Sequence, residues 1–431
     1  MSFDLSRILK LSAPIALLLA AACALAQGGE DLTAKLKTLP YVTAVQLSPR
    51  GVYDITFRQP VDHSHPGGPK FDQHVFLAHS GFDKPVLLNT EGYATGGVRG
   101  GELSQILGAP NLVAVEHRYF GHSIPSPVVW KYLTVKNAAD DMHAVVSSLK
   151  KLYTGKWVAT GASKGGQTSL FYKCYYPNDV DATVAYVAPV NLGQEDPRID
   201  QFIATVGDEA TRDKIKAFQI ALLKREDQVI PLLAVDPHDY SMGVAKAFEY
   251  GVLEIPYAYW QYGGNERDGA LPDPDSPDAT LAAAYKKIGA MYFYSDRGVK
   301  QFEAFQYQAF TEIGYYNYDI TDLKPYLKAN PNPTNLDICP AGTQAGIVFH
   351  PETMAFVFNY LQYKAQNVIF VYGETDAWSA TQMQLLGRTN AVKIVVKGAW
   401  HNASIRAASP EQKEKVYSSL ESWLGMPLTR L

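Results

Sequence analysis

The chain has 431 residues and a formal net charge of −4 at pH 7, from 39 Lys and Arg residues against 43 Asp and Glu residues. Nucleic-acid-binding proteins usually carry a basic excess, so this charge argues against nucleic acid as a partner. At roughly 100 to 200 residues per domain, the length predicts a large core and two domains.

The first 26 residues have the pattern of a secretory signal peptide. Arg7 and Lys10 precede an almost wholly apolar run over 11–26 that ends in small residues. We expect cleavage near Ala26 and export of the mature protein. Cys23 offers an alternative interpretation, as a lipidated cysteine. No other stretch reaches the roughly 20 apolar residues that a membrane-spanning helix needs, so no membrane span is predicted.

Two cysteines, Cys174 and Cys339, remain after this cleavage. In an oxidising compartment they could form one disulfide, although the sequence does not show whether their Cα atoms come within bonding range. Two free, buried cysteines are the equally open alternative.

Short apolar runs that end in Gly-rich or polar turns predict six strands in the first part of the chain. Between the fourth and fifth runs, apolar residues recur at helical spacing over 137–152. Alternating strands and helices indicate a mostly parallel sheet with helical crossovers. The predicted strands cover 53–57, 74–78, 85–89, 112–116, 157–160 and 182–187.

The pattern changes after residue 190. Long helical patterns and many aromatic residues fill the next part, which we expect to form a mostly helical cap inserted into the sheet domain. Its aromatic stripe over 248–262 is interpreted as packing within the cap. Beyond the cap, helices are predicted over 354–365 and 410–424, and strands over 368–372 and 392–396. The predicted division is a signal peptide over 1–26, a first core segment over 27–190, the cap over 191–345 and a second core segment over 346–431.

The motif Gly161-Ala162-Ser163-Lys164-Gly165 directly follows a predicted strand and opens a helical segment. A nucleophile elbow has this strand, sharp turn and helix, with small residues two positions before and after the serine so that the backbone can turn tightly. The helix N-terminus also favours negative charge that develops beside the serine. The motif therefore predicts Ser163 as a catalytic nucleophile.

A serine hydroxyl needs a histidine to remove its proton and an acid to orient that histidine. Asp376 and His401 each follow a predicted strand, and among the ten histidines only His401 lies beyond Asp376. The chain order Ser, acid, His is that of the α/β-hydrolase fold. We therefore expect this fold, with Ser163, Asp376 and His401 as the triad and Glu374 as the alternative acid.

An acyl-transfer site also needs two backbone N–H groups that bind the oxyanion of the tetrahedral intermediate. In this fold one belongs to the residue after the nucleophile and the other to the loop after the third strand. The sequence places Lys164 at the first position and Tyr93 or Gly92 at the second.

Besides the elbow, sequence blocks at 57–63, 116–123 and 311–316 carry a family resemblance, and the block Glu-His-Arg-Tyr-Phe-Gly-His-Ser at 116–123 is the most specific. Together they resemble the secreted serine peptidases of peptidase family 37, which are tripeptidyl-aminopeptidase-like. They are more loosely similar to the prolyl carboxypeptidase and dipeptidyl peptidase relatives. The resemblance implies cleavage of oligopeptides near a terminus, with a link to proline, in a pocket roofed by the helical cap.

An exopeptidase recognises a charged terminus, and a free α-amino group requires a carboxylate in the cleft. We expect Glu312, between aromatic residues of the predicted cap, to serve this role, with Glu91 and Glu116 as further candidates. A purely structural role for Glu312, as a helix cap or as the partner of an arginine, is the alternative. Glu116 and Arg118 are expected to form a buried ion pair beneath the site.

The sequence contains no H-E-x-x-H, C-x-x-C or Walker motif, and no G-x-G-x-x-G that opens a helix after the first strand, so no metal or cofactor is predicted. Peptides are the predicted partners, and the oligomeric state stays open. Two other functions remain as alternatives. One is an esterase or lipase with the same triad, since fold and triad do not set the acyl group, and the other is a binding protein that has lost activity.

Overall fold

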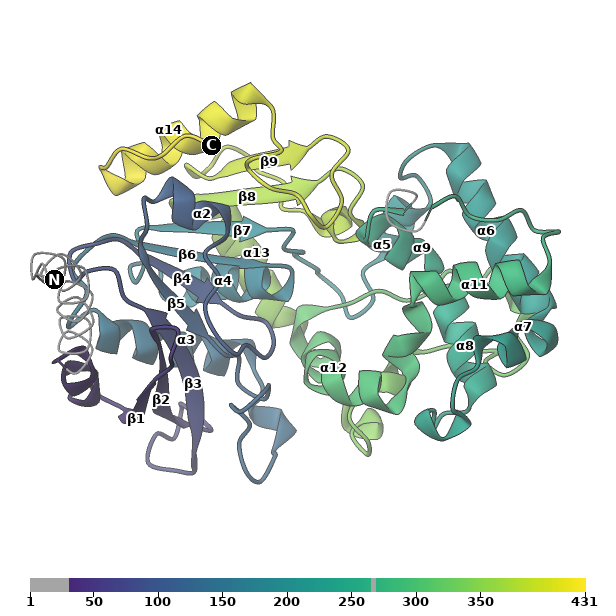
Figure 1. Ribbon diagram of the computed structural model, residues 1–431, viewed down its shortest axis with the longest axis horizontal. Coiled ribbons are helices and arrows are strands. Elements are labelled where there is room, and N and C mark those ends of the chain that lie inside the picture. Colours follow the sequence, from purple (N-terminus) through teal and green to yellow (C-terminus); the bar gives the residue numbers. More distant parts are fainter. Residues whose placement is uncertain (1–30, 265–268) are drawn as a thin grey trace, which may run out of the picture.

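The computed structural model describes residues 31–264 and 269–431 (Figure 1). Nine strands form a sheet in the order β1-β2-β3-β5-β4-β6-β7-β8-β9. The pairs β1–β2, β2–β3 and β3–β5 are antiparallel, and every pair from β5–β4 to β8–β9 is parallel. The mostly parallel sheet expected from the sequence is confirmed. The strands are β1 (Val42–Leu47), β2 (Val52–Pro60), β3 (Lys70–Ala78), β4 (Val86–Thr90), β5 (Asn111–Val115), β6 (Trp157–Ala162), β7 (Ala182–Tyr186), β8 (Val368–Gly373) and β9 (Val392–Val396).

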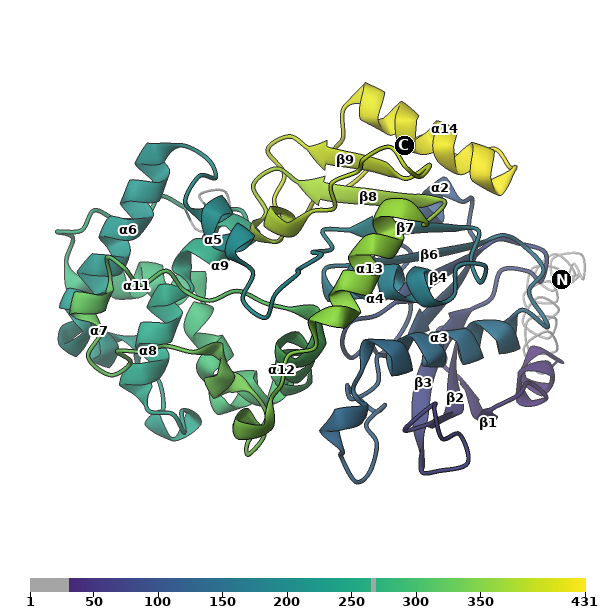
Figure 2. The same ribbon diagram turned by 180° about the vertical axis from the view of Figure 1, so that it is seen from behind.

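Helices cover both faces of the sheet, so its central strands are buried on both sides. Figure 2 shows α3, α4 and α13 on one face, and α2 and α14 pack on the other. This burial explains the continuous apolar runs in the sequence: every residue of β8 is buried. The helices are α2 (Gly101–Ile106), α3 (Val135–Leu149), α4 (Lys164–Tyr175), α13 (Pro351–Tyr363) and α14 (Pro410–Leu424), with the short 3₁₀ helix η9 (Ala377–Thr381) after β8.

The chain between β7 and α13 adds no strand to the sheet in the part that the structure describes, and it forms helices instead. Figure 1 shows these helices on the side toward which the arrows of β8 and β9 point. Ligand sites of open α/β sheets gather at this end of the strands. The predicted boundaries of a cap domain stay a prediction. The helices are α5 (Pro197–Ile203), α6 (Glu209–Lys224), α7 (Glu226–Leu233), α8 (Val244–Leu253), α9 (Ile255–Gln261), α11 (Asp278–Ile288) and α12 (Asp296–Gln308), which a π-helical turn (Ala309–Ile313) follows.

Cys174 and Cys339 are both free and buried, so the structure has the second of the two arrangements left open by the sequence. The predicted signal peptide over 1–26, with Cys23, lies outside the described residues. Within the described ranges, no helix combines the length and apolar character required to cross a membrane.

Candidate active site

Ser163 occupies the sharp turn between β6 and α4. Its backbone φ of 55° and ψ of −126° are strained for a residue with a side chain, as in a nucleophile elbow. The Ser163 N–H donates to the Tyr186 carbonyl at the end of β7, at 2.9 Å, which fixes the turn to the sheet. A Cβ on Gly161 would lie 2.3 Å from the Gly165 carbonyl oxygen, so only glycine fits there. The strand, turn and helix predicted around Ser163 are all present.

Asp376 and His401 lie on the loops that follow β8 and β9. The Asp376 side chain is fully buried, and its Oδ2 lies 2.9 Å from His401 Nδ1. Its Oδ1 accepts the Trp378 amide at 3.2 Å, so the carboxylate is held from two sides. The imidazole presents Nε2 on its opposite edge. Glu374, the alternative acid, instead accepts the Gly398 amide at 2.8 Å and holds the two loops together.

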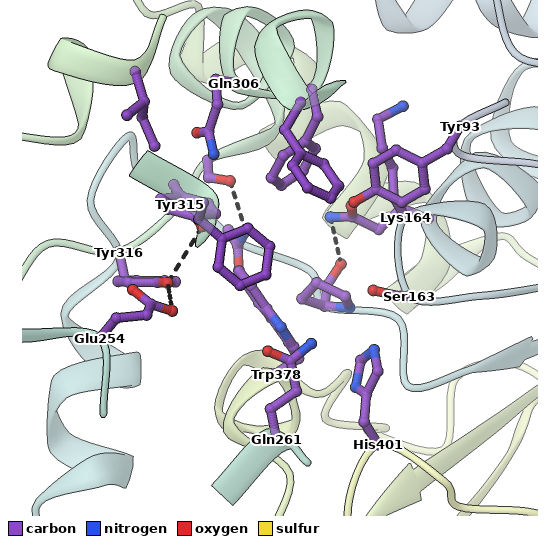
Figure 3. A pocket seen from close by; sticks show the side chains of 18 of the residues that line it. Tyr93, Ser163, Lys164, Glu254, Gln261, Gln306, Tyr315, Tyr316, Trp378 and His401 are labelled. Carbon is purple, nitrogen blue, oxygen red and sulfur yellow. Dashed lines mark hydrogen bonds between the residues drawn. The ribbon is translucent and has the colours of Figure 1, made fainter. Parts of the chain in front are cut away.

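Ser163 and His401 line one cavity of about 260 Å³ beneath the helices. Figure 3 shows these two residues on one side of the cavity, and Glu254 and Tyr316 on the other. A mostly apolar wall with a few polar groups is typical of small-molecule and peptide pockets. The aromatic residues that line the cavity are Tyr93, Tyr262, Phe293, Tyr294, Phe302, Phe305, Tyr315, Tyr316 and Trp378.

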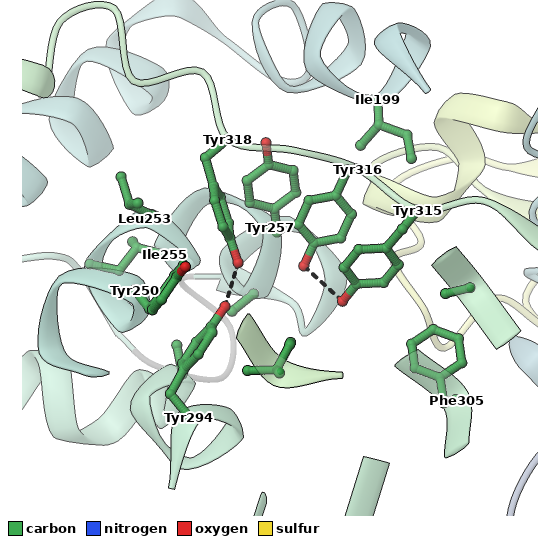
Figure 4. Packing of buried hydrophobic residues seen from close by; sticks show 14 of the residues in the cluster. Ile199, Tyr250, Leu253, Ile255, Tyr257, Tyr294, Phe305, Tyr315, Tyr316 and Tyr318 are labelled. Atoms are coloured by element: carbon green, nitrogen blue, oxygen red, sulfur yellow. Dashed lines mark hydrogen bonds between the residues drawn. The ribbon is translucent and has the colours of Figure 1, made fainter. Parts of the chain in front are cut away.

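Among the described residues that line the cavity, Glu254 is the one carboxylate, and it is not one of the residues predicted from the sequence. Tyr316 donates to its Oε1 at 2.6 Å, and the hydroxyls of Tyr318 and Tyr294 lie 3.0 and 3.3 Å from its Oε2. Figure 4 shows the hydroxyls of Tyr294 and Tyr318 meeting beside Tyr316. Burial raises the pKa of Glu254 to about 7, against the opposing effect of the three hydroxyls. Glu254 is therefore partly ionised at neutral pH.

Glu312, the carboxylate predicted to bind an amino terminus, lies outside the residues that line this cavity. Its Oε2 accepts the amide of Val135, the first residue of α3, at 2.6 Å, and its Oε1 accepts the Thr353 hydroxyl at 3.2 Å. A carboxylate at a helix N-terminus satisfies an amide that has no partner within the helix. Glu312 thus caps the start of α3, which is the structural role expected as the alternative.

Glu116 and Glu91 do not line the cavity either. Glu116 accepts the amides of Thr95 and His122 at 3.1 and 2.9 Å and the Ser123 hydroxyl at 2.7 Å, so it holds the loops beside the sheet. Burial raises the pKa of Glu91. Neither carboxylate is therefore among the residues that line the cavity with Ser163.

The expected ion pair between Glu116 and Arg118 is wrong. Arg118 instead pairs with Asp141 on α3, with Nε 2.6 Å from Oδ2 and Nη2 2.8 Å from Oδ1, and both side chains are fully buried. The Arg118 Nη1 donates further to the carbonyls of Val61 and Tyr132. A planar guanidinium prefers this two-point contact, which Asp141 offers from the neighbouring helix.

The backbone of Lys164, Gly92 and Tyr93 lies beside Ser163. Lys164 is the first residue of α4, where a helix amide has no partner within the helix. A Cβ on Gly92 would lie 2.6 Å from the Lys164 Cβ, so the loop after β4 lies directly against the start of α4. Tyr93 and Lys164 both line the cavity. The three residues predicted for the oxyanion hole are thus brought together.

Across the described residues, no group of three or more His, Cys, Asp or Glu side chains is arranged to hold a metal ion.

The chain is similar to several known proteins. The chain matches the PS-10 peptidase S37 family over residues 29–430. It is 30% identical over 412 residues to the prolyl tri/tetrapeptidyl aminopeptidase of Streptomyces mobaraensis, across 92% of this chain and 85% of that protein. The thymus-specific serine protease of Homo sapiens is 21% identical over 426 residues, across 82% of each. A solved structure, proline iminopeptidase of Mycobacterium smegmatis, is similar with a TM-score of 0.42 and 14% identity, across 86% of this chain and 97% of that one. The chain therefore belongs to the PS-10 peptidase S37 family and is a serine-type peptidase with the α/β-hydrolase fold.

Proposed function

We propose that Ser163, His401 and Asp376 form the catalytic triad of this peptidase. Asp376 holds the imidazole at Nδ1, which leaves Nε2 to take the Ser163 proton. Ser163 Oγ then bonds to the carbonyl carbon of the scissile peptide bond. The C–N bond breaks as Nε2 returns the proton to the leaving amine, and water releases the acyl group from Ser163 by the same two steps.

We assign the oxyanion hole to the amides of Lys164 and Tyr93, with Gly92 as the alternative second donor. The position of Lys164 at the start of α4 and the close approach of Gly92 support this assignment. Two such donors stabilise the negative charge that develops on the carbonyl oxygen, and each is worth about 10²-fold to 10³-fold in kcat.

We infer that the peptidase recognises the free amino terminus of its substrate through Glu254. The observation that carries this inference is a buried carboxylate on the wall opposite Ser163, in the same cavity. In the part of the chain that the structure describes, its side-chain partners are neutral tyrosine hydroxyls, and burial raises the pKa of the carboxyl group, so that it is only partly ionised at neutral pH. A bound α-ammonium would supply the missing positive charge.

An amino terminus held at Glu254 sets how many residues reach Ser163, so the enzyme would release short peptides of defined length. The similarity to a prolyl tri/tetrapeptidyl aminopeptidase supports the same class of substrate, which is oligopeptides with a free amino terminus. We propose further that residues 191–345 form the cap over the pocket and that residues 1–26 direct export, so that the enzyme acts outside the cytoplasm.

The test is hydrolysis of chromogenic amides that carry one to four residues, each with a free and with a blocked amino terminus. We expect cleavage of the free-amino tripeptidyl and tetrapeptidyl amides, and we expect Ser163→Ala to abolish both this cleavage and labelling by a fluorophosphonate. Wild-type rates in Ser163→Ala would refute the triad. Equal rates on free and blocked amides would refute recognition at Glu254, and turnover of simple esters alone would favour an esterase.

A further inference from the structure

The Lys164 side chain, next in sequence to the nucleophile, is buried. Only 3% of the residue is exposed, and among the described residues no acidic group is close enough to offset the effect of burial, which lowers the pKa of Lys164 to about 7. Lysine is rarely buried without a carboxylate partner, because a buried ammonium loses its hydration. A buried lysine beside a nucleophile therefore needs a role that outweighs this loss.

The partner of Lys164 is the imidazole of His117, with Nζ 3.3 Å from Nε2. The other ring nitrogen, Nδ1, lies 2.8 Å from the Arg118 carbonyl oxygen, which can only accept. Nδ1 therefore carries the ring proton, and Nε2 accepts from the Lys164 N–H. His117 remains neutral, since burial and then the Lys164 charge hold its pKa well below the usual value.

His117 and Lys164 together contact the loop that carries Tyr93. The His117 amide donates to the Tyr93 carbonyl at 3.3 Å. The Lys164 Nζ lies 5.9 Å from the centre of the Tyr93 ring and 5.4 Å from that of Phe120, and the two rings meet edge to face. Figure 3 shows Tyr93 and Lys164 next to each other on the same side of the cavity as Ser163.

We propose that the Lys164 side chain is a positioning residue that sets the geometry of the oxyanion hole. The Lys164 amide is one of the proposed donors and Tyr93 carries the other, so this ammonium, through His117, ties the start of α4 to the loop after β4. The inference rests on the proposed function. Since the two donors act on the developing oxyanion, loss of the ammonium should weaken transition-state binding and leave substrate binding nearly unchanged.

The test compares Lys164→Met and Lys164→Arg with the wild type in steady-state hydrolysis of a free-amino tripeptidyl amide, from about pH 5.5 to about pH 9.5. Methionine keeps an apolar stem without the ammonium, and arginine keeps a charge at every pH used. The matched control is Lys173→Met at the other end of α4. Lys173 is also buried, and its Nζ donates to the carbonyls of Pro177 and Val180. Among the described residues, the titratable and charged groups that surround the Lys164 ammonium, or line the same cavity, are His117, Arg118, Tyr93, Tyr262, Tyr294, Tyr315, Tyr316, His401 and Glu254.

In the wild type, kcat should fall as the pH rises past about 7, because Lys164 loses its proton there. Lys164→Met should lower kcat at least about tenfold at pH values below 7, change KM by no more than about twofold, and lack this alkaline fall. Lys164→Arg should restore part of kcat and move the fall to higher pH. Lys173→Met should leave kcat and its pH profile as in the wild type.

A wild-type kcat in Lys164→Met overturns the proposal, and so does a lowered kcat that keeps the wild-type alkaline fall. Thermal unfolding shows whether Lys164→Met folds. If it does not, His117→Phe replaces it, because this variant removes the acceptor and should lower kcat with the same small change in KM; an unchanged kcat then overturns the proposal. Failure of the proposed function is seen separately, as hydrolysis that persists in Ser163→Ala.

Discussion

Replacing Glu254 by glutamine removes a carboxyl group that burial makes difficult to ionise. Its pKa is about 7 in the folded protein and 4.5 in an ordinary environment. Between these values the unfolded chain has lost its proton and the folded protein has kept it, so the folded state loses stability as the pH rises from 4.5 to about 7. At about 1.4 kcal/mol per pH unit, the loss amounts to about 3 kcal/mol. Glu254→Gln should lack this loss.

Urea unfolding of both proteins at about pH 5 and about pH 8 measures this difference. Between the two pH values, the free energy of unfolding of the variant should rise by about 3 kcal/mol relative to that of the wild type.

The same variant is also tested in steady-state hydrolysis. KM for a free-amino tripeptidyl amide should rise about tenfold or more, as expected for loss of one charge-assisted contact, and KM for the blocked amide should not change. Glu312→Gln is the matched control, since Glu312 is also buried but outside the cavity. Equal pH dependence of stability in Glu254→Gln and the wild type would refute the raised pKa of Glu254. An unchanged KM for the free-amino amide would refute recognition of the amino terminus by Glu254.

Four other substitutions test the fold and the triad. Asp376→Asn removes the charge that faces the imidazole and should lower kcat about 10⁴-fold. Glu374→Gln, whose carboxylate holds a loop amide, should keep kcat within about threefold in the same assay, and a similar loss in both variants would refute the choice of acid. Gly161→Ala places a Cβ 2.3 Å from the backbone and should destabilise the protein by about 1–3 kcal/mol, read as a lower urea midpoint; an unchanged midpoint would contradict the tight turn. Asp141→Asn breaks the buried pair with Arg118 and should cost about 3–5 kcal/mol in chemical unfolding. A loss below about 1 kcal/mol would mean that the carbonyl partners of Arg118 suffice.

Elements that are buried or well capped could be predicted closely from the sequence. The predicted strand over 392–396 coincides with β9, and the predicted helix over 410–424 coincides with α14. A capping box of Ser409 and Gln412, with Pro410 at the first helical position, marks the start of α14. By contrast, β1 was not predicted. It is an edge strand whose residues are half-buried or exposed, so its sequence has neither a continuous apolar run nor a clear alternation of apolar and polar residues.

The catalytic candidates could be found in the sequence because each follows a strand, and the carboxyl ends of parallel strands meet at one edge of a sheet. Glu254 could not be found in this way, since its environment depends on tyrosines from distant segments. The two glutamates inside the aromatic stripe, Glu249 and Glu254, were nevertheless a signal, because charged residues are rarely buried without a partner. Glu249 accepts backbone amides of residues 328–330, and Glu254 faces the cavity. Glu116 and Arg118 are close in sequence, yet the guanidinium pairs with Asp141, which lies on a helix packed against the sheet. Tertiary packing decides such pairings.

The cavity holds two buried groups that titrate in the same range with opposite consequences. The pKa of Lys164 is lowered to about 7 and that of Glu254 is raised to about 7, in both cases chiefly by burial. Below this pH the lysine is charged and the glutamate is neutral, and above it the reverse holds. If Lys164 orders the oxyanion hole and Glu254 anchors the amino terminus, the two requirements overlap only near neutrality, so kcat/KM for a free-amino amide should peak sharply there. A blocked amide does not need an ionised Glu254, so the acid limb of its pH profile should extend to lower pH. Coincident acid limbs for the two substrates would show that Glu254 has no part in recognising the amino terminus.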